Sequence, residues 1–249
     1  MISGRTLPGS SILLPQAART PHNMKQVIPI THEAKSIAAF GGRLAFAVST
    51  GQDSAVMLHL MSRFTDLKKH AFFHWSRYPE MLPYQRRYIE TVERKYGISI
   101  EIRLWPRNKG NEFRAFTDSF MEKNGCSLCL FAYRMDESLQ RRGMIKKFTD
   151  GIDYERRWAY PLRSFTKPKV RSYAKNFRVP LNIEYAMGMK QDMGNHRGIR
   201  AFYLRHFIGE EDYQCAIRQD PRVEIDYIRI TSDPEFWKNA ERNIEKDQG

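Results

Sequence analysis

Short apolar runs and amphipathic segments alternate along the first 150 residues of the chain. Runs with the length and composition of β-strands occupy the ranges 44–48, 71–75, 98–105 and 127–133. Helical spacing of apolar residues predicts helices over 31–40, 54–64, 83–96, 111–123 and 137–148. This alternation predicts an α/β fold with a mostly parallel, twisted sheet that carries helices on both faces.

Changes in composition divide the chain into three parts. Residues 1–30 are rich in Ser, Pro, Gly and Thr and are expected to form a loosely ordered arm. Residues 31–180 contain the alternating strands and helices and are expected to form the α/β domain. Residues 181–249 are expected to form a C-terminal, mainly helical extension.

The charge of the chain is large, positive and unevenly distributed. There are 41 Lys and Arg residues against 28 Asp and Glu, a net charge of +13. Residues 134–178 contain thirteen basic and five acidic residues, whereas 209–249 contain six basic and eleven acidic ones. A basic middle segment indicates a polyanionic ligand such as a nucleotide, a nucleic acid or a sulfate-like group. The alternative is a solvated surface whose sign has no functional meaning.

Several classes of protein do not fit the composition. Three cysteines allow at most one disulfide bond, and the apolar patch at 12–14 is too short for a signal peptide. No stretch approaches the ~20 apolar residues that a membrane-spanning helix needs. We therefore expect a cytoplasmic protein without a membrane partner rather than a secreted, membrane or disordered one.

The turn between the first predicted strand and its helix has the strongest chemical character. It reads Ser-Thr-Gly-Gln-Asp-Ser over 49–54, and its backbone N–H groups would converge at the positive end of the helix dipole. Ser49 and Ser54 add hydroxyl donors, while Asp53 beside an anion implies a bridging Mg²⁺. The pattern is neither G-x-x-x-x-G-K-[ST] nor G-x-G-x-x-G. The alternative is an ordinary turn in which Asp53 or Ser54 caps the helix.

The segment STGQDSAVMLHL at 49–60 resembles the PP-loop of the adenine-nucleotide α-hydrolase superfamily, in the branch of phosphoadenosine phosphosulfate (PAPS) reductases and the small subunit of ATP sulfurylase. Three blocks in the same order carry the resemblance further, at 78–81, 134–141 and 160–173. The similarity extends over roughly 43–230, to PAPS reductase-like proteins often carried by bacteriophages. Thr50 and Phe165 depart from the commoner Gly and Trp of the family.

The resemblance implies an enzyme that binds ATP or PAPS with Mg²⁺, and it assigns roles to particular residues. Those implied to bind the nucleotide are Ser49, Thr50, Gly51, Gln52, Asp53, Ser54, His74, Trp75, Arg134 and Arg141. Those implied to be catalytic are Asp53, Ser54 and Arg134, with Asp53 holding Mg²⁺.

Some of these assignments have plain alternatives. Arg134, Arg141 and Arg142 suit phosphate oxygens, but they also fit a solvated helix face paired with acidic neighbours. His74 and Trp75 stand where the family often has an Asp-Thr pair, so the adenine contact would be an unusual one. The basic residues Lys167, Lys169 and Arg171 either bind a second polyanion or coat a helix.

The cysteines leave two interpretations open. The E-C-G-x-H tail of true PAPS reductases is not found, which weakens a reductase assignment. The spacing of Cys126, Cys129 and Cys215 is similar to that of tRNA 2-thiolation enzymes in which three thiolates hold an iron–sulfur cluster. The competing interpretation is that all three are small buried hydrophobic residues.

Three functions are therefore consistent with the sequence. The first is adenylyl or sulfur-group transfer with an adenine nucleotide. The second is sulfur modification of a nucleic acid, tRNA or DNA, by an enzyme of the same superfamily. The third is a non-catalytic interaction protein on a nucleotide-binding scaffold. The acceptor, the sulfur donor and the oligomeric state stay open.

Overall fold

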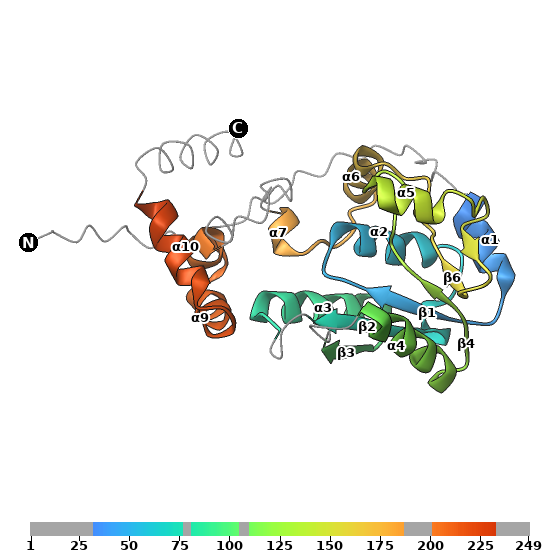
Figure 1. Ribbon diagram of the computed structural model, residues 1–249, viewed down its shortest axis with the longest axis horizontal. Helices are drawn as coiled ribbons and strands as arrows, with labels where there is room; N and C mark the ends of the chain where they lie inside the picture. Colours follow the sequence, from blue (N-terminus) through green and yellow to red (C-terminus); the bar gives the residue numbers. More distant parts are fainter. Residues whose placement is uncertain (1–31, 77–80, 105–109, 187–200, 233–249) are drawn as a thin grey trace, which may run out of the picture.

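The computed structural model describes residues 32–76, 81–104, 110–186 and 201–232 (Figure 1). The N-terminal arm expected over 1–30 and the first three residues of the block at 78–81 lie outside the described residues.

A six-stranded sheet forms the centre of the fold. Its strands are β1 (Arg43–Val48), β2 (Ala71–Ser76), β3 (Ile100–Leu104), β4 (Cys126–Leu130), β5 (Ile152–Asp153) and β6 (Trp158–Ala159). The order is β3-β2-β1-β4-β6-β5, and all neighbours are parallel except β5 and β6. The predicted α/β fold with a mostly parallel sheet is confirmed. The last two strands have two residues each, which is too short for a hydrophobic pattern to reveal.

The helices alternate with the strands along the chain. Those of the sheet domain are α1 (His32–Phe40), α2 (Gln52–Met61), α3 (Pro83–Tyr96), α4 (Gly110–Lys123), α5 (Leu139–Ile145) and α6 (Lys167–Asn176). The helix α5 begins two residues later than its expected start at 137, because the Ser138 side chain accepts a hydrogen bond from the Arg141 backbone N–H at 3.1 Å and caps it.

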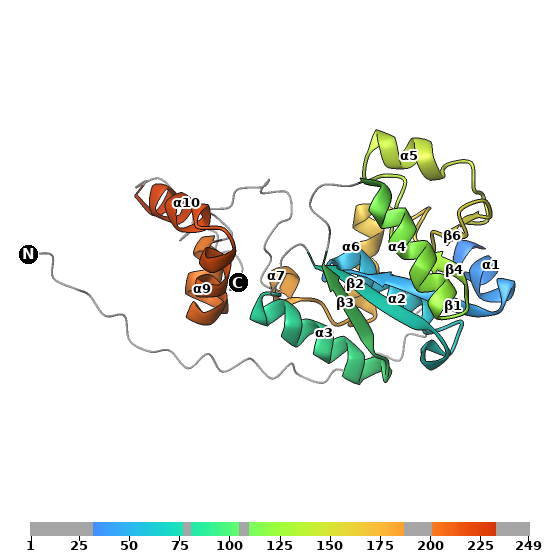
Figure 2. The same ribbon diagram turned by 60° about the horizontal axis from the view of Figure 1, so that its bottom comes forward.

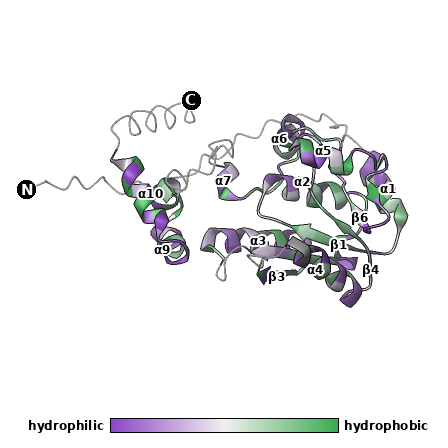
Figure 3. Cartoon of the chain, in the orientation of Figure 1, coloured by the Kyte–Doolittle hydropathy of each residue, from purple (hydrophilic) through white to green (hydrophobic). Residues whose placement is uncertain are grey.

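Alternation along β1 assigns the helices to the two faces of the sheet. Leu44, Phe46 and Val48 share one core cluster with α1, α2, α3 and α6, whereas Ala45 belongs to a second cluster with α4 and α5. α4 lies across the front of the sheet in Figure 2, and β1 is coloured as hydrophobic in Figure 3. A strand buried on both faces explains why 44–48 reads as a continuous apolar run.

The strand order also locates the functional edge of the sheet. β1 has β2 on one side and β4 on the other, so the order of strands reverses at β1. In open α/β sheets, ligands bind in the crevice outside the carboxyl ends of the strands at such a reversal. The loops that follow β1 and β4 are therefore the ones expected to form a site.

The C-terminal part forms a small helical unit beside α3. It contains a π-helical turn (Leu204–Ile208), α9 (Glu210–Gln219) and α10 (Arg222–Thr231), and α7 (Ile183–Ala186) precedes it in the chain. In Figure 1, α9 and α10 lie together beyond one end of α3. Within the part of the chain that the structure describes, no helix is long and apolar enough to cross a bilayer.

A buried carboxylate joins this unit to the sheet domain. The first residue before α3, Leu82, provides no side-chain cap. Instead Asp212 of α9, 1% exposed, accepts hydrogen bonds from the Tyr84 backbone N–H at 2.7 Å and from Arg87 Nη2 at 2.8 Å. Asp212 thus caps α3 from a distant part of the chain, which fixes α9 against the end of that helix.

Candidate functional site

A cavity of about 840 Å³ lies at the carboxyl ends of β1 and β4. Its lining includes the loop at 49–54, an aromatic wall, Glu137 and Arg141 near the start of α5, Tyr185 of α7, and residues 219–222 from the end of α9 to the start of α10. Small-molecule sites typically measure ~300–1,000 Å³, so this volume suits a nucleotide-sized ligand. The cavity therefore occupies the position that the strand order indicates.

The loop after β1 is organised by its two serines. The Ser49 backbone N–H donates to Ser54 Oγ at 3.0 Å, and the two hydroxyl oxygens are 2.9 Å apart. The Gly51 backbone N–H donates to Ser49 Oγ at 3.2 Å. Gly51 is the N-cap of α2 and supplies no side-chain cap, and neither Asp53 nor Ser54 caps the helix. The beginning of α2 therefore lacks the internal acceptor that an ordinary turn would give it, which suits an external anion.

Gly51 leaves little room for a side chain in this turn. A Cβ atom added there would lie 3.2 Å from Ser49 Oγ and 3.5 Å from Tyr185 Oη. With a larger residue, the Ser49 hydroxyl that receives the Gly51 N–H would have to shift by a few tenths of an ångström.

Arg134 connects the loop to the segment that follows β4. Arg134 is 5% exposed, and its Nε lies 3.1 Å from Asp53 Oδ1. It also forms an ion pair with Asp136, whose other oxygen accepts a hydrogen bond from the Lys167 backbone N–H at 2.6 Å. Arg134 is buried rather than on a solvated helix face, and it lies behind Asp53 instead of lining the cavity.

Three acidic residues, Asp53, Glu137 and Asp220, line the cavity, and Asp220 pairs with Arg222 at 2.8 Å. Burial raises the pKa of Asp53, and the charge of Arg134 partly offsets that increase. Burial also raises the pKa of Glu137, and the negative charge of Asp53 raises it further. Both anions are therefore less stable in this cavity than in water, and a cation beside them would relieve the repulsion. Glu137 was expected only to pair with an arginine, so its place in the cavity was not foreseen.

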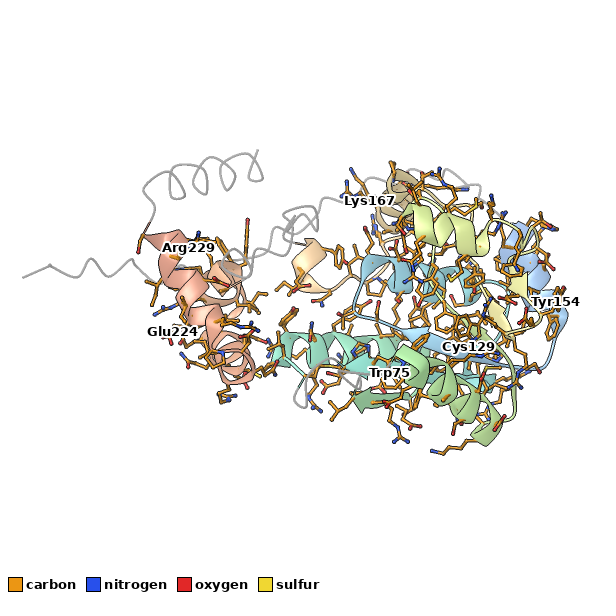
Figure 4. The ribbon with its side chains drawn as sticks, in the orientation of Figure 1. Trp75, Cys129, Tyr154, Lys167, Glu224 and Arg229 are labelled. Atoms are coloured by element: carbon orange, nitrogen blue, oxygen red, sulfur yellow. The ribbon has the colours of Figure 1, made fainter. Side chains whose placement is uncertain are left out.

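An aromatic wall faces the loop across the cavity. It contains Trp75 at the end of β2, Phe113 of α4, and Phe131 and Tyr133 after β4. The Arg141 guanidinium lies 3.3 Å from the centroid of the Tyr133 ring. Trp75 was predicted from the sequence; Phe131 and Tyr133 were not, although they directly follow the strand on the other side of the reversal. Trp75 also packs on Phe116 of α4, and Figure 4 labels it.

His74 has a different position from its neighbour Trp75. It is 7% exposed and does not line the cavity; its Nδ1–H donates to the Val48 carbonyl oxygen at 2.8 Å. This bond joins the ends of β1 and β2 and holds the start of the loop. Among the other predicted residues, Thr50 and Gln52 also do not line this cavity, whereas Arg141 does.

The three cysteines lie in two separate parts of the core. Cys126 and Cys129 of β4 belong to the cluster under α4, while Cys215 of α9 belongs to the cluster between α9 and α3 (Figure 4 labels Cys129). All three are buried, and burial raises the pKa of Cys126 and of Cys129. Among the described residues, which include every cysteine, no three His, Cys, Asp or Glu side chains are grouped to hold a metal. The arrangement does not bring the three predicted cluster ligands together and favours their role as buried hydrophobic residues.

The loop, the aromatic wall and the two arginines Arg134 and Arg141 lie in a segment of the chain that matches a known protein family. Residues 43–144 match the family model described as the phosphoadenosine phosphosulfate reductase domain. The resemblance to PAPS reductases is confirmed. The PAPS reductase-like segment runs from β1 into α5, and it contains Asp53, Trp75, Arg134 and Arg141. No curated protein sequence matches the chain significantly.

Solved structures with related backbones are distant. The U34-tRNA thiolase NcsA from Methanococcus maripaludis, solved with its 4Fe–4S cluster, is 15% identical with a TM-score of 0.44, over 60% of this chain and 63% of that one. A PAPS reductase from Candida auris, solved as a phosphate complex, is 14% identical with a TM-score of 0.41, over 63% of this chain and 84% of that one. The FMN adenylyltransferase from Candida glabrata is 14% identical with a TM-score of 0.44, over 61% of this chain and 56% of that one. The chain thus spans less than two thirds of the length of NcsA and of the adenylyltransferase.

Proposed function

We propose that this PAPS reductase-like protein binds ATP in the 840 Å³ cavity and catalyses adenylyl transfer. An acceptor oxygen would attack the α-phosphorus, forming a new P–O bond, while the bond to the pyrophosphate oxygen breaks and the acceptor proton passes to solvent or a base. The observation that carries the proposal is the ion pair of Asp53 and Arg134. It joins the loop after β1 to the segment after β4 beside the cavity.

The two ends of the cavity suit the two ends of ATP. The N-terminus of α2 and the Ser54 hydroxyl offer donors to the pyrophosphate, and Arg141 adds a guanidinium on the same cavity wall as Glu137. The rings of Trp75 and Tyr133 offer a surface for adenine. Donors fixed before the reaction stabilise charge that develops on the leaving pyrophosphate.

The carboxylates fit a magnesium ion. Mg²⁺ in nucleotide sites takes one or two carboxylates, with phosphate oxygens and water completing the octahedron. Asp53 and Glu137 supply this number of hard oxygen ligands, and both have a raised pKa that a divalent cation would reverse. The ion would neutralise phosphate charge, while Arg134 holds the Asp53 carboxylate in position.

The cysteines favour ATP over reduction of PAPS. Reduction by the thiol route of the family needs a nucleophilic cysteine at the nucleotide. None of the three cysteines lines the cavity, and all are buried elsewhere. Adenylyl transfer needs no thiol and uses only groups that line or adjoin the cavity.

The test is pyrophosphate release from ATP by Asp53→Asn, with Glu90→Gln on the exposed surface of α3 as the matched control. We expect Asp53→Asn to lower turnover by about a hundredfold or more, since it removes the charge that holds Mg²⁺ and pairs with Arg134. The control should keep full activity. Equal turnover in wild type and Asp53→Asn contradicts the proposal. Tight ATP binding by wild type without any product supports the non-catalytic alternative instead.

A further inference from the structure

A second groove, of about 340 Å³, lies on the other side of the same loop. Gln52 of the loop lines it, together with α6 and the turn that follows, from which Arg171, Lys175 and Arg178 contribute. Neighbouring residues of the loop therefore line two different sites: Asp53 and Ser54 line the nucleotide cavity, and Gln52 lines the groove. A ligand in the groove would lie next to a nucleotide in the cavity without occupying its space.

The groove belongs to the part of the chain with the greatest excess of positive charge. Residues 156–183 contain eight Lys and Arg residues and no Asp or Glu. Upstream of α6 this charge is neutralised: Arg156 pairs with Asp153 at 2.8 Å, and Arg163 pairs with Glu33 at 3.5 Å. Two cations of the groove are not paired in this way. Lys175 and Arg178 are exposed, and neither has an acidic side chain within 4 Å in the described part of the chain.

Arg178 adopts a backbone conformation that does not favour an arginine. Its φ is +48°, in the left-handed region where glycine is normally selected after a helix. The backbone bonds that end the helix, such as Val179 N–H to the Ala174 carbonyl at 2.9 Å, need no side chain from position 178. Glycine would form the same turn with less strain. An arginine at this position carries a backbone strain that glycine would not have, and its exposed side chain places a positive charge at the groove.

The positive charge continues from the groove toward the nucleotide cavity. Lys167, at the first turn of α6, is close enough to Asp53 to lower that carboxyl's pKa, and Figure 4 shows it at the end of the helix. Ten residues of α-helix extend about 15 Å, so cations along α6 can meet successive phosphates rather than one ion. A track of this length suits a polymer with repeating negative charge.

We propose that the groove formed by Gln52 and the C-terminal half of α6 binds the phosphate backbone of a polynucleotide. The polymer would be the acceptor on which the nucleotide site acts, and only this second statement rests on the proposed adenylyl transfer. Lys175 and Arg178 would contact phosphates, whereas base identity would be read elsewhere.

The experiment measures binding of a fluorescein-labelled single-stranded RNA, without nucleotide, by anisotropy between 50 and 200 mM salt. The test variant is Lys175→Gln/Arg178→Gln. The matched control is Lys146→Gln/Lys147→Gln, which removes the same charge from exposed positions beside α5. We expect the test variant to raise Kd about tenfold or more and to reduce the slope of log K against log salt by about 1.4, because two single-strand phosphate contacts are lost. The control should stay within about twofold of wild type.

A second variant separates folding from charge. Arg178→Gly suits the left-handed backbone, so a higher Kd in this variant at a melting temperature no lower than that of wild type reports the lost charge and not a loss of folding. If the test and control double variants raise the Kd for RNA equally, the effect comes from the net charge of the protein and the proposal is overturned. It is also overturned if the wild type does not bind RNA at 50 mM salt, or if polyglutamate binds and RNA does not compete with it. Pyrophosphate release from ATP is measured separately, so failure of either proposal is seen without the other.

Discussion

Asp53 and Arg134 lie with Oδ1 and Nε 3.1 Å apart, although one follows β1 and the other follows β4. The loop with Asp53 and the segment with Arg134 are far apart in the sequence. The ion pair therefore joins them across the point where the strand order reverses, and Asp136 extends the connection to the start of α6.

Replacing Arg134 by methionine should damage both stability and activity. The variant leaves the Asp53 and Asp136 carboxylates without their buried cation, and breaking such a pair from one side costs about 3–5 kcal/mol. Urea unfolding measures the loss. Arg114→Met on α4, whose pair with Asp118 is half exposed, is the control and should cost under about 1 kcal/mol. Adding Asp53→Asn to Arg134→Met should restore part of the lost stability, and a further loss would contradict this account.

How far the sequence predicted the site can be judged from adjacent residues. Asp53 and Ser54 were predicted because the loop directly follows an apolar strand, and both line the cavity. His74 and Trp75 were predicted as a pair, yet successive side chains of a strand point to opposite faces, and only Trp75 lines the cavity. The periodicity of a strand cannot say which of two neighbours faces a ligand before the sheet order is known.

The parts that sequence reasoning missed depend on contacts between distant segments. Residues 219–222 line the cavity although they belong to the C-terminal helices. Nothing in their composition indicates this, because it follows from the bond between Asp212 and the start of α3. Gln52 was expected at the nucleotide, but the first turn of α2 directs it to the groove beside α6.

Trp75 should report nucleotide binding directly. Its indole contacts Phe116, with ring centroids 4.2 Å apart and the rings tilted by 59°, and the residue also lines the cavity. Stacking of a base on an aromatic side chain contributes ~1–3 kcal/mol, so Trp75→Ala should raise the Kd for ATP by about 5- to 150-fold. Titration by calorimetry measures this, and ATP should change the tryptophan fluorescence of wild type but not of Trp75→Phe.

Trp158 provides the control for this measurement. It is buried in the same core cluster as Trp75's partners but does not line the cavity. Trp158→Phe should lower stability and leave the ATP Kd unchanged. An unchanged Kd in Trp75→Ala would show that adenine does not lie on this wall.

His70 should make the protein less stable as the pH falls. The Leu44 backbone N–H donates to His70 Nδ1 at 3.1 Å, so the proton is on Nε2, which donates to Thr65 Oγ1 at 2.7 Å. Burial lowers the pKa of His70 in the folded chain. The unfolded ring takes up a proton near pH 6.5 and the folded ring does not, so unfolding becomes easier below that pH. The slope from this group is at most about 1.4 kcal/mol per pH unit.

The measurement is the free energy of unfolding between pH 7.5 and 5.5 in wild type and in His70→Asn. Asparagine retains an acceptor for the Leu44 N–H but does not titrate, so the decrease in stability toward low pH should be smaller. His32→Asn, at an exposed position in α1, is the control and should retain the wild-type slope. Identical slopes in all three proteins would rule out the contribution of His70.

Asp212→Ala should weaken nucleotide binding from outside the cavity. The substitution removes the cap from α3 and leaves Arg87 without its 2.8 Å partner, at a cost of about 2 kcal/mol. Since Asp212 holds α9 against α3, its loss should release the cavity wall at 219–222. We expect a higher KM for ATP with a smaller change in kcat, because the loop and Arg134 are untouched.

Glu211→Gln distinguishes this positioning role from a general effect of charge. Glu211 also approaches Arg87, at 3.8 Å, but its side chain is 75% exposed and caps no helix. Its replacement should change neither stability nor KM by a measurable amount, because exposed pairs contribute about 0–1 kcal/mol. If Glu211→Gln and Asp212→Ala raise KM equally, the effect comes from the charge near Arg87. If only Asp212→Ala does so, the buried cap on α3 determines where the C-terminal wall of the cavity lies.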